Sequence, residues 1–150
     1  MGKLKGAVLA GVAASALVAT AAPAQASTYE GIQTFKFEDS NSMCISDLSE
    51  GLGPAKCVGT NYQKWGVYAA PNVRAFKNVQ TGRCIQGGWD ARVVSVVCQG
   101  SDYQRFNILH NDDGSIELKN VATGNCITFA PGKALYLSRC VKNEPWQSLV

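Results

Sequence analysis

The chain has 150 residues, of which 46% are hydrophobic and 17% charged, with 14 basic and 11 acidic side chains. Two of the basic residues, Lys3 and Lys5, lie at the extreme N-terminus, so the rest of the chain carries 12 basic against 11 acidic side chains, a net charge of +1. A balance so close to neutral excludes the electrostatic footprint of proteins that bind nucleic acids or anionic membranes.

The first 26 residues have the organisation of a secretory signal peptide. Lys3 and Lys5 precede an apolar run over residues 6–22, and the small-x-small triplet Ala24-Gln25-Ala26 follows it. This order predicts cleavage after Ala26 and a secreted mature domain over residues 27–150 without a membrane span. A membrane anchor is the alternative, although the apolar run is slightly short for a span.

Beyond the leader, the pattern of apolar residues predicts strands. Residues 34–37 and 115–119 alternate apolar and polar side chains, and residues 93–97 and 134–137 are short apolar runs of strand length. Clusters of turn-forming residues separate these runs, at residues 51–54, 87–88, 111–114 and 131–132. No window after residue 26 has the apolar stripe of an amphipathic helix, so the sequence predicts an all-β domain.

One pattern occurs three times along the chain. Asn-Val-Gln-Thr-Gly-Arg-Cys-Ile begins at Asn78, Asn-Val-Ala-Thr-Gly-Asn-Cys-Ile begins at Asn120, and a fainter Ser-Asn-Ser-Met-Cys-Ile begins at Ser40. A period of about 40 residues indicates internal repeats, here over approximately residues 30–68, 69–109 and 110–150. One such copy cannot close a core, but three copies about a pseudo-threefold axis can close a barrel without exposed edges.

Six cysteines lie in the predicted mature domain, and export favours their oxidation. Each copy holds two cysteines, 13, 14 and 14 residues apart, so the simplest pairing is within each copy: Cys44–Cys57, Cys84–Cys98 and Cys126–Cys140. Metal ligation is the alternative, but no pair has Cys-x-x-Cys spacing and His110 is the one histidine of the sequence. We therefore expect three disulfides, no metal and no cofactor.

The repeats carry motifs that resemble those of the ricin-type β-trefoil lectin domain over residues 30 to 150. In each copy a Cys-Ile strand and a Cys-ended strand precede a Gln-x-Trp motif. Gln63 and Trp65 match this motif, Gln104 and Phe106 exchange one aromatic residue for another, and the third copy keeps Trp146. The resemblance implies an all-β trefoil in which the motif aromatics are buried at equivalent positions and the glutamines hold local backbone.

The resemblance also implies where a sugar would bind. Ricin-type lectins use an Asp two residues after the first cysteine, an aromatic two residues before the second, and an Asn before the motif. Here these positions are held by Ser46, Gln86 and Thr128, by Ala55, Val96 and Ser138, and by Tyr62, Tyr103 and Asn143. Only Asn143 matches, so a family-type galactose site is in doubt in all three copies.

Substitute residues in the second copy offer a different sugar site. Trp89 follows two glycines and precedes Asp90 and Arg92, so we expect its indole on an exposed loop as a stacking platform. Asp90, Gln86 and Arg92 would then hydrogen-bond the sugar hydroxyls. The alternative is that Trp89 folds back over the rim of the barrel.

Other residues have a sugar-binding interpretation and a structural one. In the first copy, Asp47 lies one residue beyond the family position and either reaches a sugar or is a solvated loop residue. Tyr62 and Tyr103 either line pocket walls or pack as half-buried residues. Phe129 and Tyr136 either form an aromatic wall or take part in ordinary strand packing.

The sequence lacks the residue sets of common enzymes. It shows no nucleophile with a base, no pair of carboxylates at a fixed separation, no phosphate loop and no zinc signature, so we expect a protein without catalytic activity. Two binding functions remain. The first is a secreted lectin-like protein that recognises a glycan or cell-surface polysaccharide, and the second is a protein-binding trefoil, either a subunit of a secreted complex such as a toxin assembly or an inhibitor.

Overall fold

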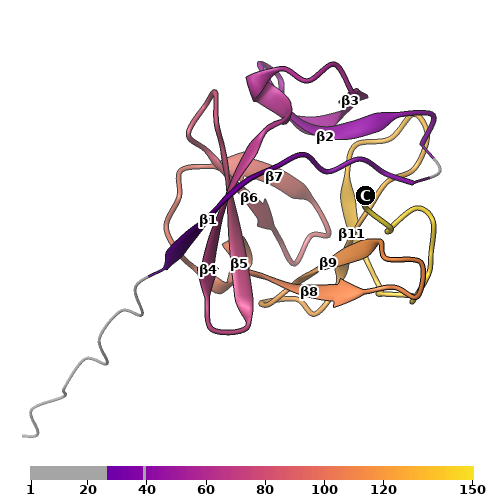
Figure 1. Ribbon diagram of the computed structural model, residues 1–150. Helices are drawn as coiled ribbons and strands as arrows, with labels where there is room; N and C mark the ends of the chain where they lie inside the picture. Colours follow the sequence, from indigo (N-terminus) through magenta and orange to yellow (C-terminus); the bar gives the residue numbers. More distant parts are fainter. Residues whose placement is uncertain (1–26, 39) are drawn as a thin grey trace, which may run out of the picture.

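The computed structural model describes residues 27–38 and 40–150, so the predicted signal peptide lies outside the described residues. Figure 1 shows strands and short connections throughout the described chain, with no α-helix in this part, and no helix there is long and apolar enough to cross a membrane. The elements in order are β1 (Thr28–Gln33), β2 (Met43–Leu48), β3 (Gly51–Lys56), η1 (Asn61–Gln63), β4 (Trp65–Ala70), β5 (Val73–Asn78), β6 (Cys84–Gly87), β7 (Val93–Val96), η2 (Asp102–Gln104), β8 (Phe106–His110), β9 (Ile116–Asn120), β10 (Cys126–Thr128) and β11 (Tyr136–Ser138).

Hairpins of two kinds alternate along the chain and build an all-β trefoil. Hairpins β2–β3, β6–β7 and β10–β11 each begin at or beside the first cysteine of a copy, and one disulfide spans each of them. The three disulfides are Cys44–Cys57, Cys84–Cys98 and Cys126–Cys140. The predicted fold class and cysteine pairing are confirmed.

Hairpins β4–β5 and β8–β9 alternate with the disulfide-linked hairpins, and the third unit of this kind is split between distant segments. Residues 34–38 lie beside residues 147–150, where the Lys36 N–H donates to the Val150 carbonyl and the Val150 N–H donates to that of Lys36, at 3.1 and 2.9 Å. Phe37 and Ile116 both form backbone bridges to Leu149. In Figure 1 the C-terminus accordingly lies next to the indigo segment that follows β1.

The motif glutamines hold the backbone around the second cysteine of their copies, as predicted. Gln63 donates from Nε2 to the Lys56 carbonyl at 2.6 Å and accepts at Oε1 from the Val58 N–H at 2.8 Å. Gln104 makes the equivalent two bonds around Cys98, at 2.9 and 2.7 Å. Each glutamine thereby satisfies backbone groups that no strand partner reaches.

In the third copy this anchor is Gln147, which the sequence alignment missed. Gln147 donates to the Arg139 carbonyl at 2.9 Å and accepts from the Val141 N–H at 2.9 Å. Gln147 lies seven positions after Cys140, whereas in the other two copies the anchor glutamine lies six positions after the second cysteine. The assignment of the third motif to residues 144–146 was therefore wrong, and the motif is Gln147-x-Leu149.

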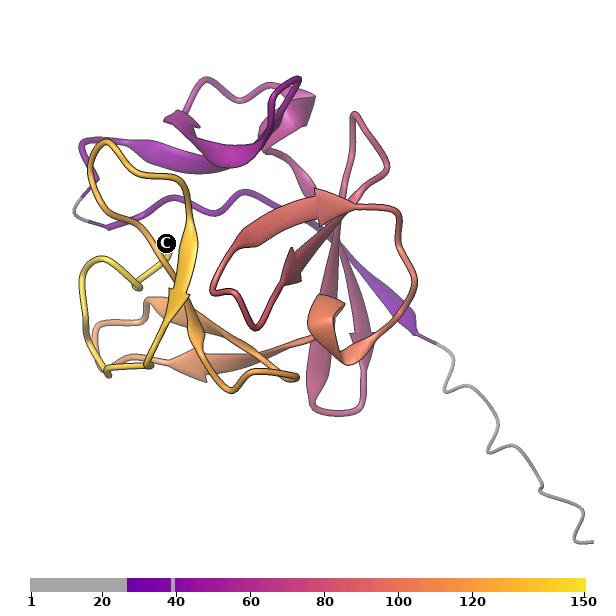
Figure 2. The same cartoon turned by 180° about the vertical axis from the view of Figure 1, so that it is seen from behind.

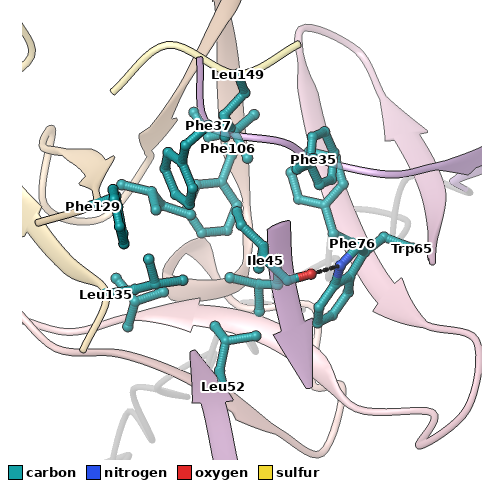
Figure 3. Close-up of a cluster of buried hydrophobic side chains, with 14 of the residues drawn as sticks. Phe35, Phe37, Ile45, Leu52, Trp65, Phe76, Phe106, Phe129, Leu135 and Leu149 are labelled. Carbon is teal, nitrogen blue, oxygen red and sulfur yellow. Dashed lines mark hydrogen bonds between the residues drawn. The ribbon is translucent and has the colours of Figure 1, made fainter. Parts of the chain in front are cut away.

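The core aromatics follow the corrected alignment. Trp65 and Phe106 are fully buried, as predicted, and Leu149 is buried at the equivalent position of the third copy. Figure 3 shows Leu149 beside Phe37 and Phe106 in one apolar cluster. The prediction that Trp146 is a buried core residue is wrong, because Trp146 stands before the anchor glutamine and is only half-buried at the edge of the cluster.

Candidate functional site

Trp89 lies on the loop that closes the β6–β7 hairpin, and 72% of the residue is exposed. Its Nε1–H donates to the hydroxyl of Tyr103 at 2.9 Å. This bond fixes the indole and satisfies its one polar group without covering the ring. Of the two interpretations of Trp89, the structure shows the exposed loop residue.

Backbone contacts hold this loop in a tight turn. The Gly88 N–H donates to the Arg92 carbonyl and the Ala91 N–H donates to the Gly88 carbonyl, both at 3.0 Å. Ala91 has a φ of 64°, a left-handed conformation uncommon for residues other than glycine. A Cβ at Gly87 would lie 2.7 Å from Leu137 Cδ1, so glycine allows the hairpin to pack directly against the third copy.

The charged residues beside Trp89 pair with each other. Arg92 Nε lies 2.6 Å from Asp90 Oδ2, and both side chains are at least half exposed. The hydrogen bond from the Arg92 side chain is the main cause that lowers the pKa of Asp90, so the carboxylate stays charged at neutral pH. Gln86 lies below the loop, where its Oε1 accepts from Gln104 Nε2 at 3.1 Å.

A second candidate site lies in the third copy, where the surface has a hollow of about 430 Å³. Aromatic side chains line it together with two charged residues, and the principal members are Phe129, Tyr136, Trp146, Arg139 and Glu144. The rings of Phe129 and Trp146 are tilted, with centroids 5.6 Å apart. Within the described residues, the side chains of Arg139 and Glu144 make no ion pair or hydrogen bond, so both are available to a ligand.

The two candidate regions adjoin. Arg92 and Tyr136 form a backbone bridge, and the Leu137 N–H donates to the Ala91 carbonyl at 2.7 Å. Figure 2 shows the β6–β7 hairpin in salmon beside the yellow-orange chain of β10 and β11. The backbone of the Trp89 loop therefore adjoins β11, the strand that contributes Tyr136 to the third-copy hollow.

Polar side chains at the ricin-type sugar positions hydrogen-bond to the anchor glutamines, and in the third copy they form the floor of the hollow. Thr128 and Ser138 hydroxyls lie 2.7 Å apart and both accept from Gln147 Nε2, at 3.1 and 2.9 Å. In the first two copies, Ser46 and Gln86 likewise accept from their anchor glutamines. These side chains bind inward to the protein instead of outward to a sugar.

Two predicted site residues lie elsewhere and have structural contacts. Asp47 is fully buried, with Oδ1 2.6 Å from Arg83 Nη2, so both interpretations of this residue, sugar ligand and solvated loop residue, are wrong. Asn143 accepts at Oδ1 from the Asp112 N–H and donates from Nδ2 to Asp112 Oδ2, both at 3.1 Å. Asn143 also does not precede the motif, because Trp146 occupies that position.

The corrected alignment shows the signal that the sequence analysis missed. An aromatic residue precedes the anchor glutamine in every copy: Tyr62, Tyr103 and Trp146. All three are at least partly exposed, and Tyr103 and Trp146 each belong to one of the candidate sites. The recurrence of this aromatic residue at one position could have identified Trp146 as a surface residue.

The sequence profile of the cytolethal distending toxin A/C domain matches residues 59–149. The chain belongs to this family. No curated protein sequence matches it. The ricin-type resemblance thus predicted the trefoil correctly, while the family that the comparison shows is the toxin A/C domain.

Solved structures share the fold of this toxin A/C domain protein. The crystal structure of the Haemophilus ducreyi cytolethal distending toxin superposes with a TM-score of 0.67 and 20% identity, over 79% of this chain and 81% of that chain. The designed threefold-symmetric protein ThreeFoil superposes with a TM-score of 0.71 and 11% identity, over 80% of this chain and 96% of that chain. A Polyporus squamosus lectin, solved with a human-type influenza-binding epitope, superposes with a TM-score of 0.69 and 14% identity, over 80% of this chain and 48% of that chain.

Proposed function

We propose that this toxin A/C domain protein is a secreted, non-catalytic subunit that attaches a toxin assembly to cells by binding surface glycans. The observation that carries the proposal is the exposed Trp89, braced by Tyr103 and adjoining a hollow lined by Tyr136 and Trp146. The family match and the trefoil shared with a lectin support it.

The chemistry of the two regions suits a carbohydrate. One face of a pyranose is apolar and stacks on an indole, while the hydroxyls at its edge need donors and acceptors. Asp90 and Arg92 supply both beside Trp89, and Arg139 and Glu144 supply both in the hollow. Because the sites are shallow, we expect dissociation constants between about 1 mM and tens of micromolar, or about 4–6 kcal/mol. Useful attachment would then depend on several contacts in one assembly.

A second function, binding of a protein partner, is favoured by strand β1. This strand lies at the edge of the sheet, paired on one side with β4, and carries the exposed Tyr29 and Ile32. An unpaired edge with apolar side chains can accept an extended segment of another protein. We include this edge in the proposal as the face toward the other toxin subunits, on a strand separate from the glycan-binding elements.

Cell-binding measurements with matched variants test the proposal. We expect Trp89→Ala and Trp146→Ala to reduce binding of the mature protein to mammalian cells by roughly tenfold each, as expected for the loss of about 1.4 kcal/mol of stacking. Val97→Ala is the control, because Val97 is 73% exposed and lies outside both regions. Removal of cell-surface glycans with glycosidases should abolish the difference between wild type and variants.

Unchanged cell binding in both tryptophan variants, or full binding to deglycosylated cells, would contradict the glycan-binding role. A pull-down from culture supernatant with the same variants distinguishes protein-partner binding from glycan binding. Retention of a secreted partner by a protein that binds no glycan would leave the partner-binding subunit as the function.

A further inference from the structure

A buried carboxyl group lies against one of the three disulfides. Glu117 on β9 is 1% exposed, and its Oε1 has no hydrogen-bond partner among the described residues. Its Oε2 lies 3.7 Å from Cys126 Sγ, and a carboxylate oxygen of Glu117 and the sulfurs of Cys126 and Cys140 all lie within 4.8 Å of one another. A buried carboxyl oxygen without a partner is costly, so a role for Glu117 beside this disulfide is worth testing.

The surroundings favour the protonated form of this carboxyl. Burial is the main cause that raises the pKa of Glu117, and the negative charge of Glu144 adds to it. The Asn111 side chain and the Asn143 backbone act in the opposite direction with smaller effect. Glu117 can therefore hold a proton next to the sulfur of Cys126 at a pH where an exposed glutamate has lost it.

Access to the disulfide is asymmetric. Cys140 is half-buried and lines a hollow of about 440 Å³ together with Glu117, His110 and Lys142, whereas Cys126 is fully buried. A thiol from solution can therefore reach Cys140 and not Cys126.

We propose that Cys126–Cys140 is a reducible disulfide, opened by a thiol that attacks Cys140, with Glu117 as the proton donor to Cys126. In the first step a thiolate forms a bond to Cys140 Sγ, the Cys126–Cys140 bond breaks, and its electron pair remains on Cys126 Sγ. That sulfur takes the proton from Glu117, which recovers a proton from water. A second thiolate then attacks the reductant's sulfur in the mixed disulfide, the bond to Cys140 Sγ breaks, and Cys140 Sγ keeps the electron pair and takes a proton from water. Two reductant thiols thereby become one disulfide, and the protein gains two thiols.

The other two copies lack this carboxyl. The first cysteine of each copy pairs with a lysine, Lys36 with Cys44, Lys77 with Cys84 and Lys119 with Cys126. Glu117 stands two residues before its lysine, and the equivalent positions are Thr34 and Ala75. The chain thus contains its own control, since Cys84–Cys98 has the same hairpin and a second cysteine that is more exposed than Cys140, but no proton donor.

The reduction rates of the three disulfides in one sample test this proposal. The oxidised, folded protein is treated with limiting dithiothreitol, free thiols are alkylated at intervals, and peptide mapping quantifies each pair. We expect Cys126–Cys140 to open roughly tenfold faster than Cys84–Cys98, a modest effect for general acid catalysis. In Glu117→Gln the rate for Cys126–Cys140 should fall to that of Cys84–Cys98 or below it, because the amide cannot transfer a proton.

The pH dependence of wild type provides a second readout that needs no variant. Both reduction rates depend on the thiolate fraction of the reductant, so the ratio of the Cys126–Cys140 rate to the Cys84–Cys98 rate does not. This ratio should fall as rising pH deprotonates Glu117. The other titratable or charged groups near the hollow are His110 at the end of β8, and Lys142 and Glu144 on the segment after Cys140. Asp112 also lies there and pairs with Lys142. Equal rates in wild type, a rate unchanged by Glu117→Gln, or a ratio independent of pH would each overturn the proposal.

Discussion

Replacement of Trp65 by alanine should lower the free energy of unfolding by about 3–5 kcal/mol, the range found when a buried aromatic side chain leaves a cavity. Trp65 is fully buried, and its Nε1–H donates to the Ile45 carbonyl at 3.1 Å, the bond drawn in Figure 3. Pro54 stands opposite Ile45 in the β2–β3 ladder and has no N–H to offer. The variant therefore loses packing and also leaves a buried carbonyl without this donor.

Denaturant unfolding of Trp65→Ala beside Trp146→Ala measures this effect. Trp146 is half-buried at the edge of the core, so its replacement should have a clearly smaller effect on the unfolding midpoint. Comparable losses for the two variants would show that Trp146 is a core residue after all. A Trp65→Ala midpoint near that of wild type would contradict the trefoil alignment.

Replacement of Asp47 by alanine should destabilise the protein by about 1–3 kcal/mol, because it leaves the buried Ser95 hydroxyl without its acceptor and the guanidinium of Arg83 without its partner. Asp47 Oδ1 lies 2.6 Å from Arg83 Nη2, and Oδ2 lies 3.0 Å from Arg83 Nε. Ser95 donates to Oδ1 at 2.5 Å and Thr81 donates to Oδ2. One carboxylate of the first copy thereby holds two segments of the second.

Asp90 is the matched control for this variant. It also pairs with an arginine at 2.6 Å, but its side chain is half exposed, and exposed pairs contribute little to stability. Thermal unfolding should show a lower midpoint for Asp47→Ala and no change for Asp90→Ala. If the two variants unfold together, the buried network does not link the copies.

The sequence was sufficient for the parts of the fold that repeat locally. The spacing of Cys44, Cys84 and Cys126 is a one-dimensional signal, and pairing within a copy follows from it. Gln63 and Gln104 donate to backbone carbonyls seven residues away, so their role can be recognised in a short window of sequence. The strand predicted at 115–119 appears as β9 and that at 93–97 as β7, whereas residues 34–37 form bridges only and 134–137 is shifted into β11.

The errors come from contacts between distant residues. The sequence around Asp47 indicates a loop residue, because Arg83, which pairs with its carboxylate, lies 36 residues away in the next copy. Residues 34–38 pair with 147–150, and no local pattern shows this closure. The alternating pattern of residues 115–119 places Glu117 on the polar, exposed face of a strand. In the structure Glu117 is buried beside the third disulfide.

The candidate site could be predicted in part. The two glycines before Trp89 indicated an exposed indole, and the structure shows one. Phe129 and Tyr136 were considered as an aromatic wall, and both line the third-copy hollow. The place of Trp146 in this hollow was missed, because Leu149 replaces the expected aromatic and an extra residue follows Cys140, which moved Trp146 into the core motif. Conformation of the intervening turn decides which residue reaches the anchor position, and the sequence alone leaves that open.

Titration of the three indole N–H signals with cell-surface glycans, by two-dimensional NMR of nitrogen-15-labelled protein comprising residues 27–150, tests the glycan-binding account most directly. The three tryptophans of the sequence differ in exposure, with Trp65 buried, Trp146 half-buried and Trp89 exposed. The account predicts saturable shifts of the Trp89 signal, accompanied by Trp146 when the hollow is filled, while Trp65 stays fixed as the internal reference. Signals of Trp89 and Trp146 that do not move at millimolar glycan would contradict it.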